Sequence, residues 1–336
     1  SMPHGQCICM TMGDPAGISG EIIVTAHARM CAGRDALARR VKRELTRKRI
    51  SLVVAGDAGY LSWHAKRMRS RIAVRSIAGV PRSFTALSAV ECIPVTSIDM
   101  KSFRFGECTY GRESIAYIDH AVAEAKRGAV AAIVTAPVTK AAVAKVLPDF
   151  RGHTEYLSEA FGAADTRMAF YTPDFILALE TVHIPLSKVA SSITAASVAK
   201  SLALIAEAGR RRYGKRAPIA VLALNPHAGE HGLMGSEDDG VIAEGMAALP
   251  SALGPFPADS FFIERYKSFK LILAMYHDQG LIPVKALYPR ASVNVTLGLP
   301  VVRTSVDHGS AYDIAGKGRA SADGLLHAIS AAIELT

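Results

Sequence analysis

The sequence lacks the features of a membrane-bound, disulfide-bonded or zinc-knuckle protein. No apolar run reaches the roughly 18 to 20 residues that a membrane-spanning helix needs, and no charged segment followed by an apolar signal core stands at the start. The five cysteines are an odd number without paired CxxC spacing, which argues against a disulfide framework and a zinc knuckle. We therefore expect a cytoplasmic protein with ordinary reduced thiols.

Two nucleotide-binding signatures are also missing. The first glycine-rich segment, MTMGDPAGISGEI (10–22), contains neither a GxGxxG pattern nor a Walker lysine motif. Its glycines allow tight turns, and the backbone N–H groups at the start of a helix could bind an anion. A plain strand-to-helix connection is equally compatible with this pattern.

The net charge of +9 comes largely from three short basic runs, 39–49, 66–71 and 210–216. Such runs usually lie on solvated helix faces or in the last turn of a helix, and no nucleic-acid reader motif accompanies them. We therefore expect an attraction for anionic small molecules and no nucleic-acid or membrane partner.

Short apolar runs alternate with longer amphipathic stretches along the chain. The strand-like runs include SLVVAG (51–56), AAIVTAP (131–137) and IAVLALN (219–225), and residues 113–128 have a helical pattern. Apolar strands alternating with helices predict an α/β fold with a largely parallel sheet that is covered on both faces. A length of 336 residues suits two subdomains around a cleft.

Three histidines follow strand-like runs: His183 in ETVHIPL, His227 in LNPHAGE and His277 in MYHDQGLIPVK. Binding sites of α/β proteins form at strand ends, and ligands far apart in sequence suit a catalytic metal better than a structural zinc. Imidazole suits Zn, Co, Ni or Fe, whereas Mg or Mn prefers more oxygen. Each histidine alone fits a hydrogen-bonded loop or core residue. Their repeated placement predicts a divalent-metal site.

Other residues suit an anionic substrate. His153 and Thr154 in RGHTEYL stand where a helix should begin, and they could bind an anion or simply cap the helix. Lys285, Asn294 and Arg303 follow at intervals of nine residues. Because residues nine apart face opposite sides of one strand, these three must come from separate elements if they converge. Lysine and arginine are suitable partners for a phosphate or carboxylate.

The most informative single segment is VDHGSAYDIAGKGRASADGLLHAI (306–329). Its glycines and small residues let the backbone approach a flat ligand. Asp313 is an acceptor that can bond a ribose 2′-hydroxyl and would repel a 2′-phosphate.

Within this segment, HGSAYDIAGKG resembles the adenosine-binding loop of the isocitrate and isopropylmalate dehydrogenase superfamily. With GDPAGI, TAPVTK, GHTEYL, VHIPL, LNPHAGE, GPFPADSFF, MYHDQGLIPVK and NVTLGLPVVRTSVDHG, the chain resembles the 4-hydroxythreonine-4-phosphate dehydrogenase family of pyridoxal-phosphate biosynthesis over residues 11 to 318. The resemblance implies a two-subdomain isocitrate/isopropylmalate dehydrogenase-like fold. Its first subdomain would comprise 1–135 plus 288–336 with the NAD adenosine loop, and its second 136–287 with the metal ligands and dimer contacts.

The resemblance also implies roles for individual residues. The ligands of one divalent ion per site, such as Zn, Co or Mg, would be His183, His227 and His277. The substrate contacts would be His153, Thr154, Lys285, Asn294 and Arg303. The NAD contacts would be His308, Gly309, Ser310, Asp313 and Gly316. The candidate proton carriers are Asp259, Asp278 and Lys285. A homodimer with its active site at the subunit interface is expected.

The implied reaction is NAD- and metal-dependent oxidation of 4-phosphohydroxy-L-threonine to 2-amino-3-oxo-4-phosphooxybutanoate, followed by decarboxylation to 3-amino-2-oxopropyl phosphate. An alternative within the family is oxidation of 4-phospho-threonate or 4-phospho-erythronate. Acyl transfer of the phosphotransacetylase kind is an alternative of another class, and the Asp313 loop argues against it. A non-catalytic sensor of phosphorylated metabolites is disfavoured because metal, cofactor and substrate residues occur together.

Two features depart from the family's usual pattern. The opening GDPAGIGPE is altered here, because Ser19 and Gly20 stand in place of Gly-Pro and remove a rigid proline at the start of a helix. His231 in GEHGLMG is also unusual. It would either compete as a metal ligand or face the solvent.

Overall fold

The computed structural model describes residues 6–336, and the chain divides into two compact units. The first unit comprises the chain up to Ala164 together with Leu299–Glu334, and the second comprises Asp165–Gly298. Each unit contains strands with helices between them, and most neighbouring strands are parallel. The predicted α/β class with a largely parallel sheet is confirmed.

The first unit contains six parallel strands. They are β1 (Cys7–Thr11), β2 (Ser51–Gly56), β3 (Val74–Ser76), β4 (Val90–Pro94), β5 (Ala132–Thr135) and β12 (Val302–Ser305). Their order is β3-β4-β2-β1-β5-β12. All residues of β1, β2, β5 and β12 are buried, as expected for parallel strands covered on both faces.

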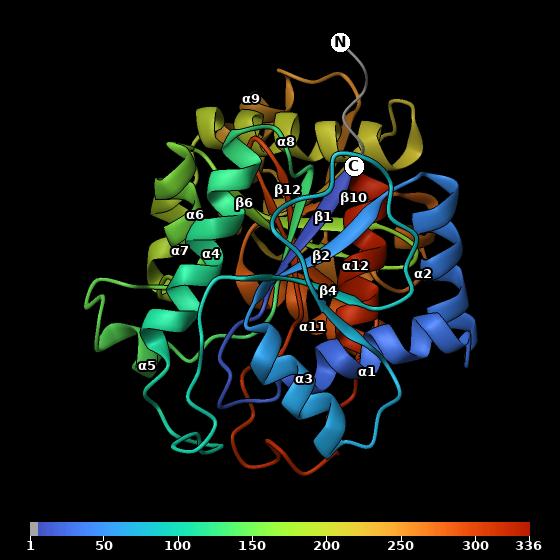
Figure 1. The fold of residues 1–336 in the computed structure, drawn as a ribbon. Helices are drawn as coiled ribbons and strands as arrows, with labels where there is room; N and C mark the ends of the chain where they lie inside the picture. The colour runs from blue at the N-terminus through green and yellow to red at the C-terminus, as the bar shows by residue number, and fades with distance from the viewer. Residues whose placement is uncertain (1–5) are drawn as a thin grey trace. The chain divides into compact units, whose positions relative to one another are not determined.

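Helices cover both faces of these strands. The helices are α1 (Ser19–Ala32), α2 (Ala36–Arg47), α3 (Ala58–Arg67), α4 (Gly111–Lys126), α5 (Lys140–Ala144), α6 (His153–Phe161) and α12 (Asp323–Leu335). Figure 1 shows α4 on one side of β1 and β2, with α2 and α12 on the other. Cys7, Cys9 and Val53 face α4 and form a core with its Ile118 and Val122. In α2 the basic run keeps its arginines exposed, as predicted, while Val41 and Leu45 are buried.

The second unit mixes both strand directions. Its strands are β6 (Arg167–Tyr171), β7 (Ile176–Leu179), β8 (Ile219–Leu222), β9 (Ala252–Phe256), β10 (Leu271–Ala274) and β11 (Val293–Leu297). Their order is β11-β6-β7-β10-β8-β9, with antiparallel pairing of β11 with β6 and of β6 with β7. The four strands from β7 to β9 are parallel. The helices are α7 (Leu186–Ser192), α8 (Ala195–Tyr213), α9 (Ala243–Met246), α10 (Ala258–Phe261) and α11 (His277–Leu287).

The boundaries of these units differ from the expected breaks at 135/136 and 287/288. Residues 136–164 belong to the first unit, because α5 and α6 pack against α4. Residues 288–298 belong to the second unit, because β11 pairs with β6. The second difference arises from a contact between elements that are distant in the sequence.

Within residues 6–336, no single helix is long and apolar enough to cross a membrane. Only α7 and α8 taken together meet the length and composition criteria, and this pair is bent by 92°.

All five cysteines are free thiols, as predicted.

Two buried histidines of the first unit predict a loss of stability in acid. The Nδ1–H of His27 donates to the Ile23 carbonyl oxygen at 2.8 Å, whereas neither ring nitrogen of His64 has a hydrogen-bond partner among the described residues. Burial lowers the pKa of each from 6.5 to about 4. Between those pH values the unfolded chain binds protons that the folded chain does not. The free energy of unfolding should therefore be independent of these groups above pH 6.5 and fall below it, by about 1.4 kcal/mol per histidine for each pH unit.

Urea unfolding of the wild type and a His64→Leu variant between pH 4 and pH 7 checks this expectation. The variant should show a shallower loss in acid, because only His27 of the pair remains. Parallel curves for the two proteins would contradict the proton linkage assigned to His64.

Candidate functional site

The second unit brings two of the three predicted metal ligands together. Strands β7, β10 and β8 are parallel neighbours, so their carboxyl ends lie at one edge. His183 follows β7, and His277 is the first residue of α11 after β10. Their ring centroids are 5.6 Å apart. The Nδ1 of His277 is 2.8 Å from Oδ1 of Asp278, which leaves the Nε2 of this ring for another ligand.

His227 does not complete a cluster with this pair. It follows β8 in the helical turn Pro226–Gly229, is exposed, and has a left-handed backbone with φ of 54°. Across residues 6–336, no group of three or more histidine, cysteine or acidic side chains lies close enough to hold one metal ion. Imidazole nitrogen is a suitable donor for a divalent metal. Two of the three predicted histidines, His183 and His277, also lie side by side.

The start of the His227 turn is fixed by a residue that the sequence analysis missed. Asp238 is fully buried, and its carboxylate accepts the backbone N–H groups of Leu224 at 2.7 Å and Asn225 at 3.0 Å. The acidic sequence around Asp238 resembles that of a solvated loop. It therefore gave no signal that this aspartate is buried. His231, two residues beyond the turn, has a side chain that is 99% exposed, and its Nδ1 lies 4.0 Å from Oδ2 of Asp239. Of the two alternatives for His231, the structure favours the solvent-facing one.

The other predicted residues of the second unit lie on separate elements, as their spacing required. Lys285 is exposed on α11, and Asp259 is exposed in the short helix α10. Asn294 lies on β11 opposite Phe170 of β6. Its Oδ1 atom is buried and has no hydrogen-bond partner among the described residues. A buried acceptor of this kind is suited to a donor from a ligand.

The first unit contains a buried cation beside the start of α6. Arg303 lies on β12 and is 3% exposed. One guanidinium nitrogen donates to Oγ1 of Thr135 at 2.9 Å, and another lies 3.5 Å from Oγ1 of Thr154. Burial lowers the pKa of Arg303 to about 10, so the side chain stays charged at neutral pH. The carboxylate of Glu155 partly offsets this effect of burial. Sequence analysis did not anticipate the role of Thr135.

His153, the first residue of α6, adds a second anion-binding feature. Its Nε2 atom is buried and has no partner among the described residues. Burial, followed by the charges of Arg303 and Lys140, lowers the pKa of His153 from 6.5 to about 3, so its ring is neutral. A cavity of about 120 Å³ is lined by His153, Thr135 and Lys140. This volume exceeds the roughly 30 Å³ share of one water molecule several-fold, so the cavity has room for a small anionic group.

The predicted cofactor loop is held against the first glycine-rich segment. The carbonyl oxygen of Ser310 accepts the N–H of Ile18 at 2.9 Å, and its hydroxyl accepts from Thr139 at 2.7 Å. A Cβ atom at Gly17 would lie 2.6 Å from the Ser310 carbonyl oxygen, so this contact requires glycine. The segment therefore supports the 306–318 loop as well as connecting β1 to α1.

The remaining loop residues lie as follows. His308 and Gly309 line the same cavity as His153. Gly316 has φ of 72°, and an added Cβ would lie 2.4 Å from the Phe105 ring. Asp313 is exposed, and its carboxylate accepts no hydrogen bond from a described residue, so it is available to a ligand.

The unusual Gly20 also has a steric explanation. A Cβ atom at this position would lie 2.5 Å from Cε1 of the buried Tyr60 ring, so the altered opening makes room for that ring. The neighbouring Ser19 hydroxyl donates to the Pro137 carbonyl oxygen at 3.1 Å.

Comparison with known proteins identifies the family. The family model described as "Pyridoxal phosphate biosynthetic protein PdxA" matches residues 48–332. The chain belongs to this family. The 4-hydroxythreonine-4-phosphate dehydrogenase of Sulfurihydrogenibium sp. is 33% identical over 333 residues, which cover 98% of each chain. The D-threonate 4-phosphate dehydrogenase of Bordetella bronchiseptica is 35% identical over 336 residues, covering 98% of this chain and 92% of that protein.

A solved structure agrees with the PdxA assignment. The crystal structure of 4-hydroxythreonine-4-phosphate dehydrogenase from Klebsiella pneumoniae has a TM-score of 0.85 and 33% identity, covering 98% of this chain and 99% of that chain. The family predicted from the motifs is confirmed. As a PdxA protein, the chain is an oxidoreductase of pyridoxal phosphate biosynthesis, which decides against the acyltransferase and sensor alternatives.

Proposed function

We propose that this PdxA protein oxidises 4-phosphohydroxy-L-threonine with NAD in a divalent-metal-dependent reaction, and that the oxo acid formed loses CO2 to give 3-amino-2-oxopropyl phosphate. The observation that carries this proposal is the neighbouring pair His183 and His277, with ring centroids 5.6 Å apart, at the ends of adjacent parallel strands. Such a pair supports coordination of a metal beside a reacting hydroxyl group.

The substrate phosphate would be bound by residues of the first unit. Arg303 supplies a buried positive charge, and the start of α6 supplies the hydroxyl of Thr154 and free backbone N–H groups. The neutral ring of His153 would donate from Nε2, the atom that has no partner among the described residues. A phosphate oxygen would accept from this donor and from the Arg303 guanidinium.

The metal would be held by His183, His277 and, as the third ligand, His227. When bound, a divalent ion supplies a Lewis acid for the secondary hydroxyl and for the ketone that replaces it. Asp278 holds the His277 ring through Nδ1, which supports a positioning role for this carboxylate. Lys285 and Asp259 then remain as the proton carriers, and the buried Oδ1 of Asn294 would accept from the donor at substrate C2.

The cofactor would be bound by the 306–318 loop of the first unit. When bound, NAD supplies the hydride acceptor. The loop backbone at His308, Gly309 and Ser310 would contact NAD. The close approach of Gly316 to the Phe105 ring supports the shape of the loop. Asp313 would accept hydrogen bonds from the adenosine ribose.

The exposed carboxylate of Asp313 predicts a preference for NAD over NADP. The 2′-phosphate of NADP would bring like charges together, so we expect kcat/KM to be about 10² to 10³ higher with NAD. Steady-state assays with both cofactors should show this preference in the wild type and its loss in an Asp313→Ala variant. Equal use of both cofactors by the wild type, or an undiminished preference in the variant, would exclude Asp313 as the selector.

The relative named D-threonate 4-phosphate dehydrogenase makes that substrate the second candidate. Both substrates carry a phosphate and a donor at C2, so the contacts described above suit either. We expect kcat/KM for 4-phosphohydroxy-L-threonine to exceed that for D-threonate 4-phosphate and D-erythronate 4-phosphate by at least about tenfold. NADH formation measured with the three compounds in parallel decides this, and the reverse order would assign the chain to the alternative activity.

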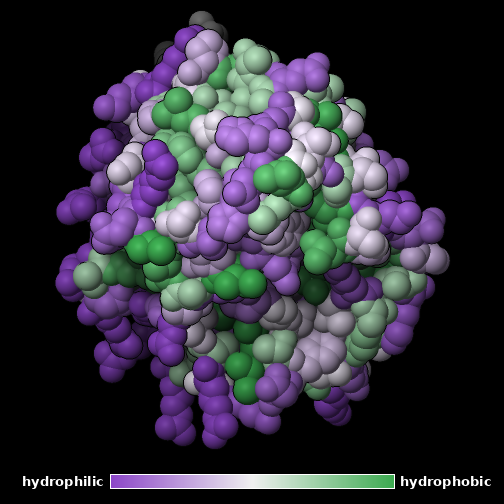
Figure 2. All heavy atoms as spheres, turned by 180° about the vertical axis from the view of Figure 1, so that it is seen from behind, coloured by the Kyte–Doolittle hydropathy of each residue, from purple (hydrophilic) through white to green (hydrophobic). Residues whose placement is uncertain are grey.

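We propose that the protein is a homodimer whose contacts lie mainly in the second unit. Most exposed large apolar side chains belong to this unit, including Leu186 and Ile263 at 71%, Leu233 at 82% and Ile282 at 67%. The face drawn in Figure 2 shows green apolar patches within a mostly purple polar surface. Exposed apolar patches often mark association sites. Sedimentation equilibrium should give twice the chain mass for the wild type and a smaller mass for Ile282→Glu, whereas a monomeric wild type would contradict the proposal.

A further inference from the structure

We propose that the first unit contains a second small-molecule site, a basic pocket between α1 and the segment after α3, which binds a nucleoside phosphate. Helices α1 and α3 lie side by side (Figure 1). The pocket has a volume of about 900 Å³, within the range of roughly 300 to 1,000 Å³ that small-molecule sites occupy. It shares no lining residue with the cavity at His153, so it is separate from the proposed substrate site.

Three arginines give the pocket an excess of positive charge. Arg34 follows the end of α1, and Arg69 and Arg71 follow the end of α3. Their guanidinium groups form no hydrogen bond or ion pair within residues 6–336. A fourth arginine at the pocket, Arg29, is paired with two aspartates and adds no free charge. The second half of the basic run 66–71 therefore lies at a pocket that suits phosphate groups, and not on a helix face.

One wall of the pocket is apolar. Val24, Ala28 and Ala32 follow one another at intervals of four residues on one face of α1. Ile72 and Ala73 come from the segment that leads into β3. An apolar wall of this kind suits a flat ring, whereas a small inorganic anion would make no use of it.

A buried carboxylate with one unpartnered oxygen indicates that the ligand carries a hydrogen-bond donor. Glu21, in the first turn of α1, is 1% exposed and lines the pocket. Its Oε1 accepts the N–H of Ala320 at 2.7 Å, whereas its Oε2 has no hydrogen-bond partner within residues 6–336. Buried acceptors rarely lack a partner, and a ribose hydroxyl or an amino group would donate to this one.

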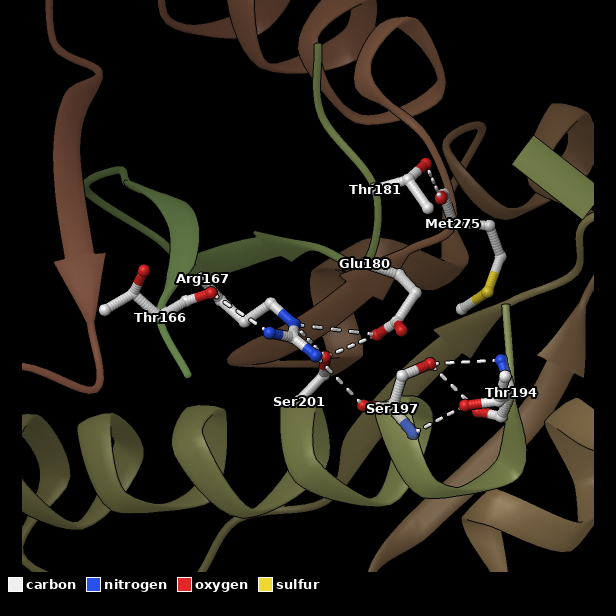
Figure 3. Close-up of polar contacts among 8 residues, drawn as sticks. All are labelled: Thr166, Arg167, Glu180, Thr181, Thr194, Ser197, Ser201 and Met275. Carbon is white, nitrogen blue, oxygen red and sulfur yellow. Dashed lines mark hydrogen bonds and ion pairs between the residues drawn. The ribbon is translucent and has the colours of Figure 1, made fainter. Parts of the chain in front are cut away.

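A buried carboxylate of the second unit shows the contrasting arrangement. The side chain of Glu180 is 1% exposed, and its Oε2 accepts from the Ser201 hydroxyl and lies 3.9 Å from Arg167 Nε. Figure 3 shows these three side chains converging. Protein donors therefore satisfy Glu180, and nothing about it indicates a ligand. No described side chain reaches Oε2 of Glu21, which leaves the pocket as the source of its donor.

These three features match the three parts of a nucleoside phosphate. The phosphates would accept from Arg34, Arg69 and Arg71, and the base would lie on the apolar wall of α1. A ribose hydroxyl or an amino group would donate to Glu21. Inorganic pyrophosphate would use only the arginines.

Alkylation of Cys31 tests this proposal without an activity assay. Cys31 lines the pocket and is partly exposed, whereas Cys108 is also partly exposed but lies outside it. At a concentration ten times its Kd, ADP should slow the reaction of Cys31 with iodoacetamide by about tenfold and leave the rate at Cys108 unchanged. Mass spectrometry of the two peptides measures both rates. Pyrophosphate should protect Cys31 at least about tenfold more weakly than ADP.

Charge variants locate the binding. Arg69→Gln combined with Arg71→Gln should raise the Kd for ADP by about tenfold or more, because charge-assisted contacts are lost. Glu21→Gln should weaken ADP by a similar factor but not pyrophosphate, since it removes a negative charge. Arg43→Gln combined with Arg47→Gln is the matched control, because these arginines are exposed on α2 and lie outside the pocket.

Several results would overturn the proposal. Absence of Cys31 protection by ADP, or equal protection of Cys31 and Cys108, would show that the pocket is not a specific site. An unchanged Kd in the Arg69 and Arg71 variant, or an equal loss in the α2 control, would leave only the general attraction of a basic protein for anions. Equal protection by pyrophosphate and ADP would exclude a nucleoside. None of these measurements involves NAD or a metal, so the proposed dehydrogenase function is tested separately.

Discussion

Replacing His277 with alanine should lower the rate of NAD reduction by at least about 10³-fold, because a Lewis acid contributes several kcal/mol to the stabilisation of the transition state. His277 stands beside His183 and is oriented by Asp278, so its loss would remove the member of the pair that a carboxylate holds. NADH formation at saturating substrate measures the rate, and elemental analysis of the same samples measures the bound metal, which should fall with it.

His231→Ala is the matched control for His277→Ala. His231 belongs to the same unit, but its side chain is 99% exposed and faces the solvent. This variant should keep the metal content and turnover of the wild type. Full metal content in His277→Ala, or equal damage from both substitutions, would show that the three histidines are not the metal ligands.

Arg303→Met should raise the KM for the phosphorylated substrate by about 10²-fold or more, on the scale of a lost charge-assisted hydrogen bond in a buried site. Methionine replaces the aliphatic part of the arginine side chain and removes its charge, so the fold should survive. Replacing a buried cation with an apolar side chain is often neutral for stability, and urea unfolding checks that it is so here. The KM for the dephosphorylated analogue should change much less.

Arg29→Met provides a comparison in the same unit. Arg29 is partly buried and is paired with Asp35 at 2.8 Å and Asp323 at 2.7 Å. Its loss should affect stability and leave the KM for the phosphorylated substrate unchanged. Similar increases in KM for the phosphorylated and dephosphorylated compounds in Arg303→Met would contradict a phosphate site at Arg303.

Local sequence patterns predicted the elements and the strand ends that carry site residues. Apolar runs such as 219–225 and 271–277 contain β8 and β10, and the histidines after them stand at one edge because parallel strands end together. The mixed strand directions of the second unit were not predicted, because the antiparallel pairing of β11 with β6 joins segments more than a hundred residues apart.

The residues that sequence analysis missed act through long-range bonds. Gln279 reaches Ala223, and Thr135 accepts from the predicted Arg303, over separations that leave no periodic signal. The position of His227 escaped prediction for another reason. Its turn contains consecutive left-handed residues other than glycine, a conformation that local sequence rarely indicates.

The most direct test of the central claim is NADH formation from 4-phosphohydroxy-L-threonine by the wild-type protein, measured as isolated, after removal of divalent ions with a chelator, and after their return. We predict NAD reduction that the chelator abolishes and that Zn²⁺ or Co²⁺ restores, with 3-amino-2-oxopropyl phosphate as the product. Undiminished NADH formation in the metal-free protein, or none under any of the three conditions, would contradict a metal-dependent dehydrogenase acting on this substrate.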